Sequence, residues 1–181
     1  MNKNNFYFLF RFRWSIPIIA EIYNQDGSRF VTLIQRLNIS RSVLTYTIDK
    51  LINDGLINRN PGYGHPLRPE YVLTDLGHKI APFCQELIIC VRKHNAQRLL
   101  QSRWSFRILF LPIREGVRFS VLISLLAPIT PRALSEELKL LINEGFIRRK
   151  IIDDYPPKAI YELSSKSQPF ITVLEKYKKD L

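Results

Sequence analysis

The stretch LINDGLINR at residues 51–59 returns as LINEGFIRR at residues 141–149, offset by 90 positions. Other segments match in the same order at nearly the same offset. RWSIPII (13–19) matches RWSFRIL (103–109), GSRF (27–30) matches GVRF (116–119), and the Pro…Tyr-x-Leu pattern ending at residue 73 matches the one ending at 163. Colinear self-similarity at a fixed offset is typical of a duplicated structural unit. The chain therefore contains two copies of one unit.

Two helices are expected before the repeated stretch in each copy. The first starts near Trp14 or Trp104 and ends before the glycine turn. The second has apolar residues at positions i, i+3, i+4 and i+7, the spacing of one buried helical face. These residues are Phe30, Leu33, Ile34 and Leu37 in copy one, and Phe119, Leu122, Ile123 and Leu126 in copy two.

A third helix follows after a tight turn. Ser40 and Thr130 are suited to cap its N-terminus, and Pro131 suits its first position in copy two. Gly55 and Gly145 stand where a helix end favours a residue with positive φ. The inward residues are Leu44, Ile48 and Leu51 in copy one, and Leu134, Leu138 and Leu141 in copy two.

Two short β patterns around a turn follow each third helix, at 56–59 and 71–73, and at 146–149 and 160–163. Such a hairpin after a helix-turn-helix is a wing. A helix is expected from Asp75 or Gly77 to about Gln101, and another from about 169 to 179. The predicted fold class is mainly α with small β-hairpin wings (α+β), with two tandem winged helix-turn-helix domains joined by a helix.

We divide the chain into an N-terminal segment (1–12), a first winged helix-turn-helix domain (13–82), a linker helix (83–102), and a second such domain with a C-terminal helix (103–181). The aromatic start, interrupted by Arg11 and Arg13, is interpreted as an ordered segment or a contact arm and not as a signal peptide.

These motifs resemble the HxlR-type regulators, relatives of the MarR group of bacterial winged-helix transcription factors. The resemblance rests on the Arg-Trp starts, the Gly-x-Arg-Phe turns, the Ile-Ser and Ile-Thr caps, and the Gly-[Leu/Phe]-Ile-x-Arg entry to each wing. It covers about residues 13–82 and 103–170. It implies DNA binding by units that pair as homodimers through their first and last helices. The chain departs from the pattern by carrying two units, and it lacks the N-terminal cysteine of redox-sensing members.

The net charge of +11 favours a polyanionic partner, either nucleic acid or an anionic membrane surface. Residues 1–90 carry 10 basic and 7 acidic side chains, and residues 91–181 carry 17 and 9. No apolar run approaches the roughly 20 residues of a membrane span. Cys84 and Cys90 lie about 240° apart around a helix, so they cannot pair, and nothing indicates an oxidising compartment. A cytoplasmic, nucleoid-associated protein is expected.

Double-stranded DNA is the expected partner, because the third helix of this motif enters the major groove with its N-terminal residues over base edges. Its candidate contacts are Arg41, Ser42, Thr45 and Tyr46 in copy one, and Arg132, Ser135 and Lys139 in copy two. If both copies read one face of B-DNA, these helices should lie about 34 Å apart. The wing candidates are Arg59, His65 and Arg68, and Arg148, Arg149, Lys150 and Lys158.

Acidic residues leave an alternative open. Glu136 and Glu137 put two negative charges on the third helix of copy two, and Asp153 and Asp154 lie at its wing tip. These residues also suit a scaffold whose winged helices bind protein surfaces. The first domain is therefore the better candidate reader of sequence.

The sequence contains no recognisable catalytic motif: it has no phosphate loop, no nucleophile elbow and no close carboxylate pair in an apolar setting. Enzymatic activity is therefore not expected. His65, His78 and His94 lack the spacing of a zinc site, so no metal and no cofactor are expected. Homodimerisation of the whole chain, and a small-molecule effector bound between the linker helix and the domains, both stay open.

Overall fold

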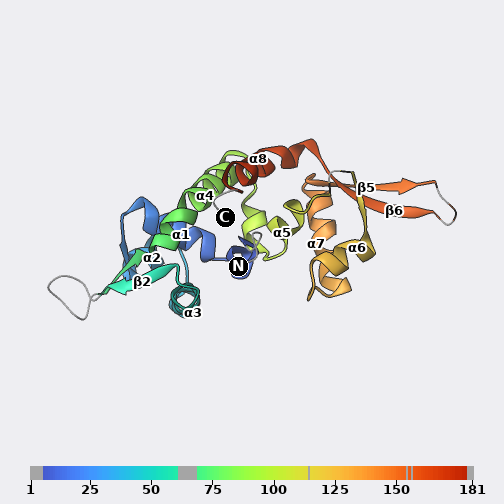
Figure 1. Ribbon diagram of the computed structural model, residues 1–181. Coiled ribbons are helices and arrows are strands. Elements are labelled where there is room, and N and C mark those ends of the chain that lie inside the picture. Colours follow the sequence, from blue (N-terminus) through green and yellow to red (C-terminus); the bar gives the residue numbers. More distant parts are fainter. Residues whose placement is uncertain (1–5, 61–68, 114, 154, 156, 179–181) are drawn as a thin grey trace.

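The repeated stretch forms the junction between a helix and a strand in both halves of the chain. Its leucines close a helix, the glycine reverses the chain, and the next residues enter a β-strand (Figure 1). The computed structural model describes residues 6–60, 69–113, 115–153, 155 and 157–178. The molecule is elongated, and its two wings point outward at opposite ends.

The N-terminal half runs from residue 6 to residue 93. Its elements are η1 (Phe6–Phe10), α1 (Ser15–Asn24), β1 (Ser28–Arg29), α2 (Phe30–Leu37), α3 (Arg41–Asn53), β2 (Ile57–Asn60), β3 (Glu70–Leu73) and α4 (Asp75–Lys93).

The C-terminal half repeats this order. Its elements are η2 (Gln97–Gln101), α5 (Ser105–Leu109), β4 (Val117–Arg118), α6 (Phe119–Leu125), α7 (Pro131–Asn143), β5 (Ile147–Ile152), β6 (Lys158–Leu163), η3 (Ser165–Ser167) and α8 (Gln168–Tyr177). The mainly helical winged-helix fold is confirmed. The residue limits of the predicted domains stay a prediction.

The expected caps are present on the third helices. Ser40 Oγ accepts a hydrogen bond from the Val43 amide at 3.4 Å, and Thr130 Oγ1 accepts one from Ala133 at 3.2 Å. Beyond the helix ends, Gly55 and Gly145 have φ of +70° and +78°, a region that side chains with a Cβ disfavour. The glycine turns therefore orient each wing relative to its third helix.

Each half contains one small antiparallel sheet, and the second strand of the wing hairpin, β3 or β6, is its central strand. The strand orders are β1-β3-β2 and β4-β6-β5. Arg59 lies opposite Tyr71 in the first hairpin, and Arg149 lies opposite Tyr161 in the second. The register places the basic residues of β2 and β5 on the outer strand of each wing.

Two helices are shorter than the sequence predicted. The helix expected to reach Gln101 ends at Lys93, because Asn95 turns the chain with a φ of +51° and the Ala96 amide bonds back to the Val91 carbonyl at 2.9 Å. A 3-10 turn, η2, follows. Helix α5 ends at Leu109, well before its glycine turn, since Pro112 has no amide hydrogen and would clash with the carbonyl one turn earlier.

One hydrophobic core extends through both halves. Helices α4 and α8 lie side by side on the upper side of the molecule in Figure 1, and η1 packs against α5. The Phe10 ring lies 5.6 Å from the rings of Phe106 and Phe110, and Phe83 lies 6.1 Å from Tyr177, all as centroid distances. The seam between the halves is therefore an aromatic part of the core. Within the described ranges, no helix is long and apolar enough to cross a bilayer.

Candidate nucleic-acid interface

The outer face of α3 carries all four candidates from copy one. Arg41, Ser42, Thr45 and Tyr46 are exposed, while Leu44, Ile48 and Leu51 of the same helix are buried. The helical period separates the two sets, because the inward residues recur every three or four positions. The structure thus brings these four side chains together over the first two turns of the helix.

Several contacts orient the side chains on this face. The Arg41 guanidinium carbon lies 5.6 Å from the centroid of the Phe30 ring, and the Thr45 hydroxyl donates to the Arg41 carbonyl at 3.0 Å. Tyr46 meets the edge of Phe12 at 5.6 Å between ring centroids. The segment after η1 therefore supports this part of α3.

Val43 was missed by the sequence interpretation. It lies in the first turn of α3 and keeps 40% of its surface exposed. Its apolar side chain gave no reason to expect it outside, but it precedes Leu44 and lies off the buried stripe of Leu44, Ile48 and Leu51. An exposed apolar side chain here can contact a thymine methyl group, which is part of major-groove readout.

The outer face of α7 carries Arg132, Ser135 and Lys139, all exposed as predicted. Arg132 Nε lies 3.0 Å from Glu136 Oε1, one helical turn further along. Such an exposed pair contributes at most about 1 kcal/mol and does not hold Arg132 in place. It does set a carboxylate beside the arginine, and this lowers the positive potential of the face.

Glu137 is a correction to the sequence interpretation. The sequence interpretation counted it with Glu136 as a negative charge on the third helix, but it is 8% exposed. Its carboxylate accepts hydrogen bonds from Ser102 Oγ at 2.6 Å and from Ser105 Oγ. A buried carboxylate needs such donors; Ser105 is the first residue of α5, and Ser102 lies three residues before it. One of the two acidic residues therefore faces the protein interior and not the outer face of α7.

The first wing shows one of its three candidates. Arg59 is exposed on β2. Burial raises the pKa of Tyr71, which lies opposite on β3, and the positive charge of Arg59 opposes part of this rise. His65 and Arg68 lie outside the described residues.

The second wing is basic along β5. Arg148 and Lys150 lie on one side of the strand, where Glu162 Oε1 is 3.3 Å from Arg148 Nε and 2.9 Å from Lys150 Nζ. Arg149 is exposed on the opposite side, and Lys158 is half-buried at the start of β6. Glu162 is itself mostly buried, and its carboxylate offsets part of the positive charge of the wing.

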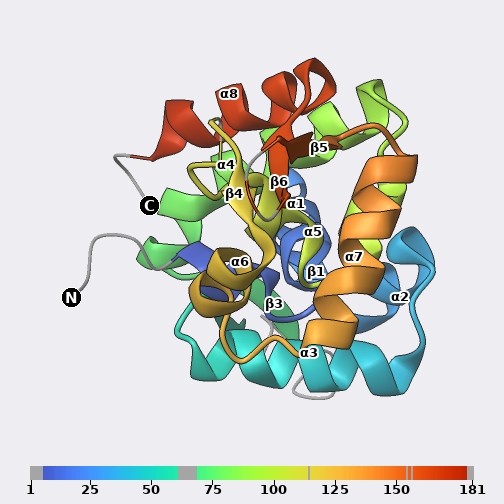
Figure 2. The same cartoon turned by 90° about the vertical axis from the view of Figure 1, so that its right-hand side faces the viewer.

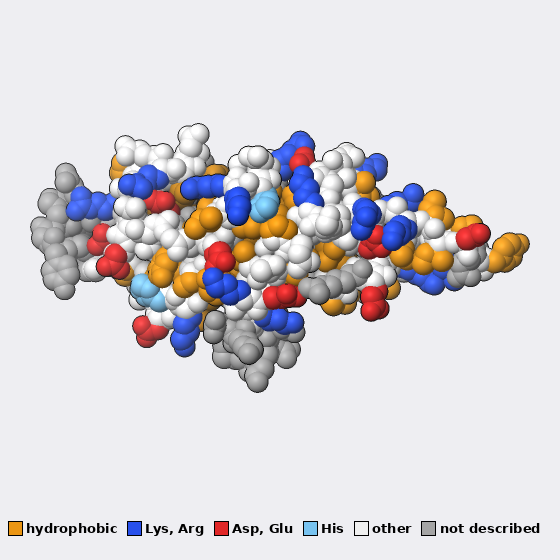
Figure 3. All heavy atoms as spheres, turned by 90° about the horizontal axis from the view of Figure 1, so that it is seen from above, with side chains coloured by type: hydrophobic (Ala, Val, Ile, Leu, Met, Phe, Trp, Pro, Cys, Tyr) orange, Lys and Arg blue, Asp and Glu red, His pale blue; other side chains and the backbone are white. Residues whose placement is uncertain are grey.

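Hydrophobic side chains occupy the outer end of the second wing. Ile151, Ile152 and Tyr155 are 66%, 45% and 100% exposed. Figure 3 shows hydrophobic side chains at the projecting right-hand end of the molecule, and it also shows lysines and arginines spread over the upper face. The positive charge is therefore not confined to the side that carries α3.

The two third helices differ in orientation. Helix α3 is seen end-on at the lower left of Figure 1, where α7 stands upright in the right half. Figure 2 shows α3 lying across the view and α7 rising steeply. The β2–β3 hairpin lies level with α3, whereas β5 leaves from near the upper end of α7. The spacing of about 34 Å between the two third helices stays a prediction.

The HxlR-like helix-turn-helix family matches the chain twice, over residues 9–98 and 99–180. This chain belongs to the HxlR-like helix-turn-helix family. The two matches correspond to the two halves, since their border falls within η2.

Two similar proteins match about half of this chain over most of their own length. An uncharacterized HTH-type transcriptional regulator, YvaP of Bacillus subtilis, is 32% identical over 91 residues, which are 50% of this chain and 84% of that protein. The HTH-type transcriptional regulator YodB of the same organism is 26% identical over 87 residues, 48% of this chain and 78% of that protein. A MarR transcriptional regulator from Methanosarcina mazei covers 72% of this chain and 74% of its own, at 18% identity and a TM-score of 0.35.

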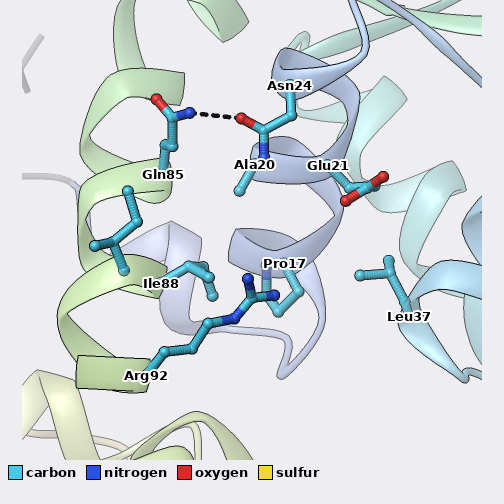
Figure 4. A pocket seen from close by; sticks show the side chains of 9 residues that line it. Pro17, Ala20, Glu21, Asn24, Leu37, Gln85, Ile88 and Arg92 are labelled. Carbon is cyan, nitrogen blue, oxygen red and sulfur yellow. Dashed lines mark hydrogen bonds between the residues drawn. The ribbon is translucent and has the colours of Figure 1, made fainter. Parts of the chain in front are cut away.

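In this HxlR-like chain a hollow of about 120 Å³ lies between α1 and α4. Figure 4 shows Arg92 and Ile88 on one side and Pro17 and Glu21 on the other, with Gln85 donating to Asn24 at 2.5 Å. Pockets for drug-sized ligands are typically about 300–1,000 Å³. The hollow is too small for such a ligand, so the effector stays a prediction.

Both cysteines of this HxlR-like chain are free thiols buried on α4. Burial raises the pKa of Cys84, and it raises that of Cys90 as well. Because the thiolate is the reactive form, this environment suits two apolar side chains that fill the core and not reactive thiols.

Proposed function

We propose that this HxlR-like protein is a transcriptional regulator that binds double-stranded DNA sequence-specifically through its winged helix-turn-helix units. One observation carries the proposal: the exposed face of α3 presents Arg41, Ser42, Val43, Thr45 and Tyr46 together, on a helix capped at the end that enters a major groove. Such a regulator acts in the cytoplasm, at the nucleoid.

Each side chain on α3 has a distinct chemical role in this proposal. Arg41 donates two hydrogen bonds to the O6 and N7 acceptors of a guanine, and Val43 packs on a thymine methyl group. Ser42 and Thr45 reach phosphates or base edges. Arg59 on β2 contacts the flanking backbone, with His65 and Arg68 of the same wing.

The joined halves take the place of a homodimer in this proposal. The aromatic contacts of Phe10 with Phe106, and of Phe83 with Tyr177, hold two units in one chain. We therefore expect one chain to be sufficient for binding, without pairing of two chains.

The experiment is a selection from random duplexes with the full chain, followed by a salt titration of the selected duplex. We expect an enriched motif. The logarithm of the binding constant should fall linearly with the logarithm of the salt concentration, with a slope of about −0.9 for each phosphate contacted. Recovery of unrelated sequences with no motif, or no binding at moderate salt, would overturn the proposal.

Protein binding by the second wing is the alternative that a specific observation favours. Ile151, Ile152 and Tyr155 expose apolar surface at its end, and exposed apolar clusters mark interaction sites more often than phosphate contacts. Charge reversal at Arg41 and Arg132 separates the two readings. If a protein complex persists and no DNA-binding defect appears, the scaffold function is the correct one.

A further inference from the structure

We infer that the DNA site of this chain is directional and non-palindromic, with its base-specific part under α3. The inference rests on the proposed function and specifies its substrate. Four observations carry it: the fixed seam, the different side chains on α3 and α7, the carboxylates of the C-terminal half, and the different orientations of the two helices.

The seam holds two unlike halves in one body. Phe10 packs on Phe106, both nearly fully buried. At the edge of the seam the Glu86 carboxylate accepts from Lys176 Nζ at 2.6 Å and from the Tyr177 hydroxyl at 2.7 Å. An inverted-repeat site matches a protein two-fold axis that relates identical surfaces. In this chain the two surfaces on either side of the seam are encoded separately.

The exposed residues of the two third helices differ in chemistry at matched positions. Arg41, Ser42, Tyr46 and Asp49 of α3 correspond, at an offset of 90, to Pro131, Arg132, Glu136 and Lys139 of α7. Base edges are distinguished by their pattern of hydrogen-bond donors and acceptors. A donor at position 41 is thus replaced by a residue without one, and a phenol at position 46 by a carboxylate, so the two helices cannot prefer the same half-site.

Carboxylates reduce the attraction of the C-terminal half for phosphate. Glu136 accompanies Arg132 on α7, and Glu162 accompanies Arg148 and Lys150 on the wing. The position matching Glu162 in the first half is Val72, and the acidic residue of β3 is Glu70, two positions earlier. The same DNA geometry therefore meets a different potential on the two sides of the seam.

The orientation of the two third helices, α3 and α7, also points to an asymmetric DNA site. A duplex laid along the lower side of the molecule in Figure 1 would run under α3 and the first wing, but it would meet α7 at its lower end. Figure 2 shows the same difference from the side. Helix α3 would thus cross the axis of such a duplex with its exposed side toward the DNA, and the C-terminal half would add contacts at one flank.

The test begins with the motif selected by the full chain. Three duplexes are compared: the selected site, an inverted repeat of its left half and an inverted repeat of its right half. Each is titrated with the wild-type chain, Arg41→Ala and Arg132→Ala, and the number of chains per duplex is measured. Lys93→Ala on α4 serves as the control for loss of one positive charge.

We expect an asymmetric motif bound by one chain per duplex. Arg41→Ala should weaken the selected site about 5- to 100-fold and relax base preference in one half of the motif only. Arg132→Ala should leave base preference in that half unchanged. A symmetric motif, whether bound by one chain or by two, would overturn the inference while leaving the proposed function intact. Failure to bind any duplex would overturn both.

Discussion

The hydroxyl of Ser102 donates a hydrogen bond to the carboxylate of Glu137 over 2.6 Å and thereby ties helix α7 to the segment before α5. The same hydroxyl accepts the Trp104 amide at 3.0 Å, and the buried Ser105 adds a second donor to the carboxylate. The third helix of the C-terminal half is therefore anchored through a polar cluster that begins at the junction of the two halves. In the N-terminal half, the residue matching Glu137 is Thr47, which bonds within its own helix at 2.8 Å.

Removal of this anchor should destabilise the protein. Glu137→Ala leaves two serine hydroxyls in buried or half-buried positions without their acceptor, at a cost of about 1–3 kcal/mol. The free energy of unfolding is measured by urea denaturation. The matched control is Glu136→Ala, on the adjacent but exposed position, with an expected change within about 0.5 kcal/mol. Equal effects of the two substitutions would contradict the buried position of Glu137.

The relation between Glu136 and Glu137 illustrates how far the sequence reaches. Helical periodicity predicted the third helices, their caps and their buried leucines, because these depend on local spacing. It also placed Glu137 directly beside the inward stripe of Leu134 and Leu138, and this adjacency was the one signal in the sequence for its burial. The acidic side chain outweighed that signal, since carboxylates are rarely buried without partners, and the partners come from 32 and 35 residues away.

The orientation of the halves was beyond sequence reasoning. It depends on how Phe10, Phe83 and Phe106 fit against one another, and side-chain packing of this kind has no sequence period. The break after Lys93 had a weak signal, since Asn95 tolerates a positive φ, but the apolar pattern continued through Leu99. The exposure of the candidates on α3 and α7 was predicted because exposure on a helix follows from the period.

The seam between the halves should behave as core. Phe106→Ala removes a ring that is 1% exposed, and such truncations cost about 3–5 kcal/mol. Phe106→Leu keeps most of the side-chain volume and should lower the free energy of unfolding by less. It allows the measurement if the alanine variant does not fold. Tyr155→Ala, at a fully exposed position, is the control. We expect a single unfolding transition that shifts as a whole, because the core is continuous. Two transitions, of which one stays in place, would show that the halves are independent.

The stabilising contact between Glu86 on α4 and Lys176 and Tyr177 on α8 should weaken as the pH falls. Hydrogen bonds from Lys176 and Tyr177 hold the pKa of Glu86 below its ordinary value of 4.5. A lowered folded-state pKa gives stability that is present above the unfolded value and lost as the pH falls through the folded one. Glu86→Gln should therefore lose less stability between pH 6 and about pH 3 than the wild type. Since Lys176 is exposed, the difference will be small.

Thermal denaturation across this pH range measures the effect. Glu115→Gln, an exposed position, is the control and should follow the wild type. If the melting temperature of Glu86→Gln runs parallel to that of the wild type down to pH 3, the Glu86 carboxylate does not stabilise the contact between α4 and α8.

Both thiols should resist modification in the folded protein. Cys84 is 0% exposed and Cys90 is 8% exposed, and burial raises the pKa of each. A chromogenic disulfide reagent should therefore react slowly with the native chain and with both thiols in denaturant. Ser165→Cys places a third thiol on the surface and should react at once. Prompt reaction of the native wild type would argue for a redox-sensing role on α4.

The most direct test of DNA reading by α3 is the ratio of dissociation constants for a scrambled and the selected duplex at one salt concentration. For the wild type we expect a ratio of at least about 10³. Arg41→Ala should reduce it by about 1–3 kcal/mol of discrimination, while Lys93→Ala should weaken both duplexes equally and leave it unchanged. A wild-type ratio near one, or an Arg41→Ala ratio equal to that of the wild type, would contradict the claim that α3 reads the sequence.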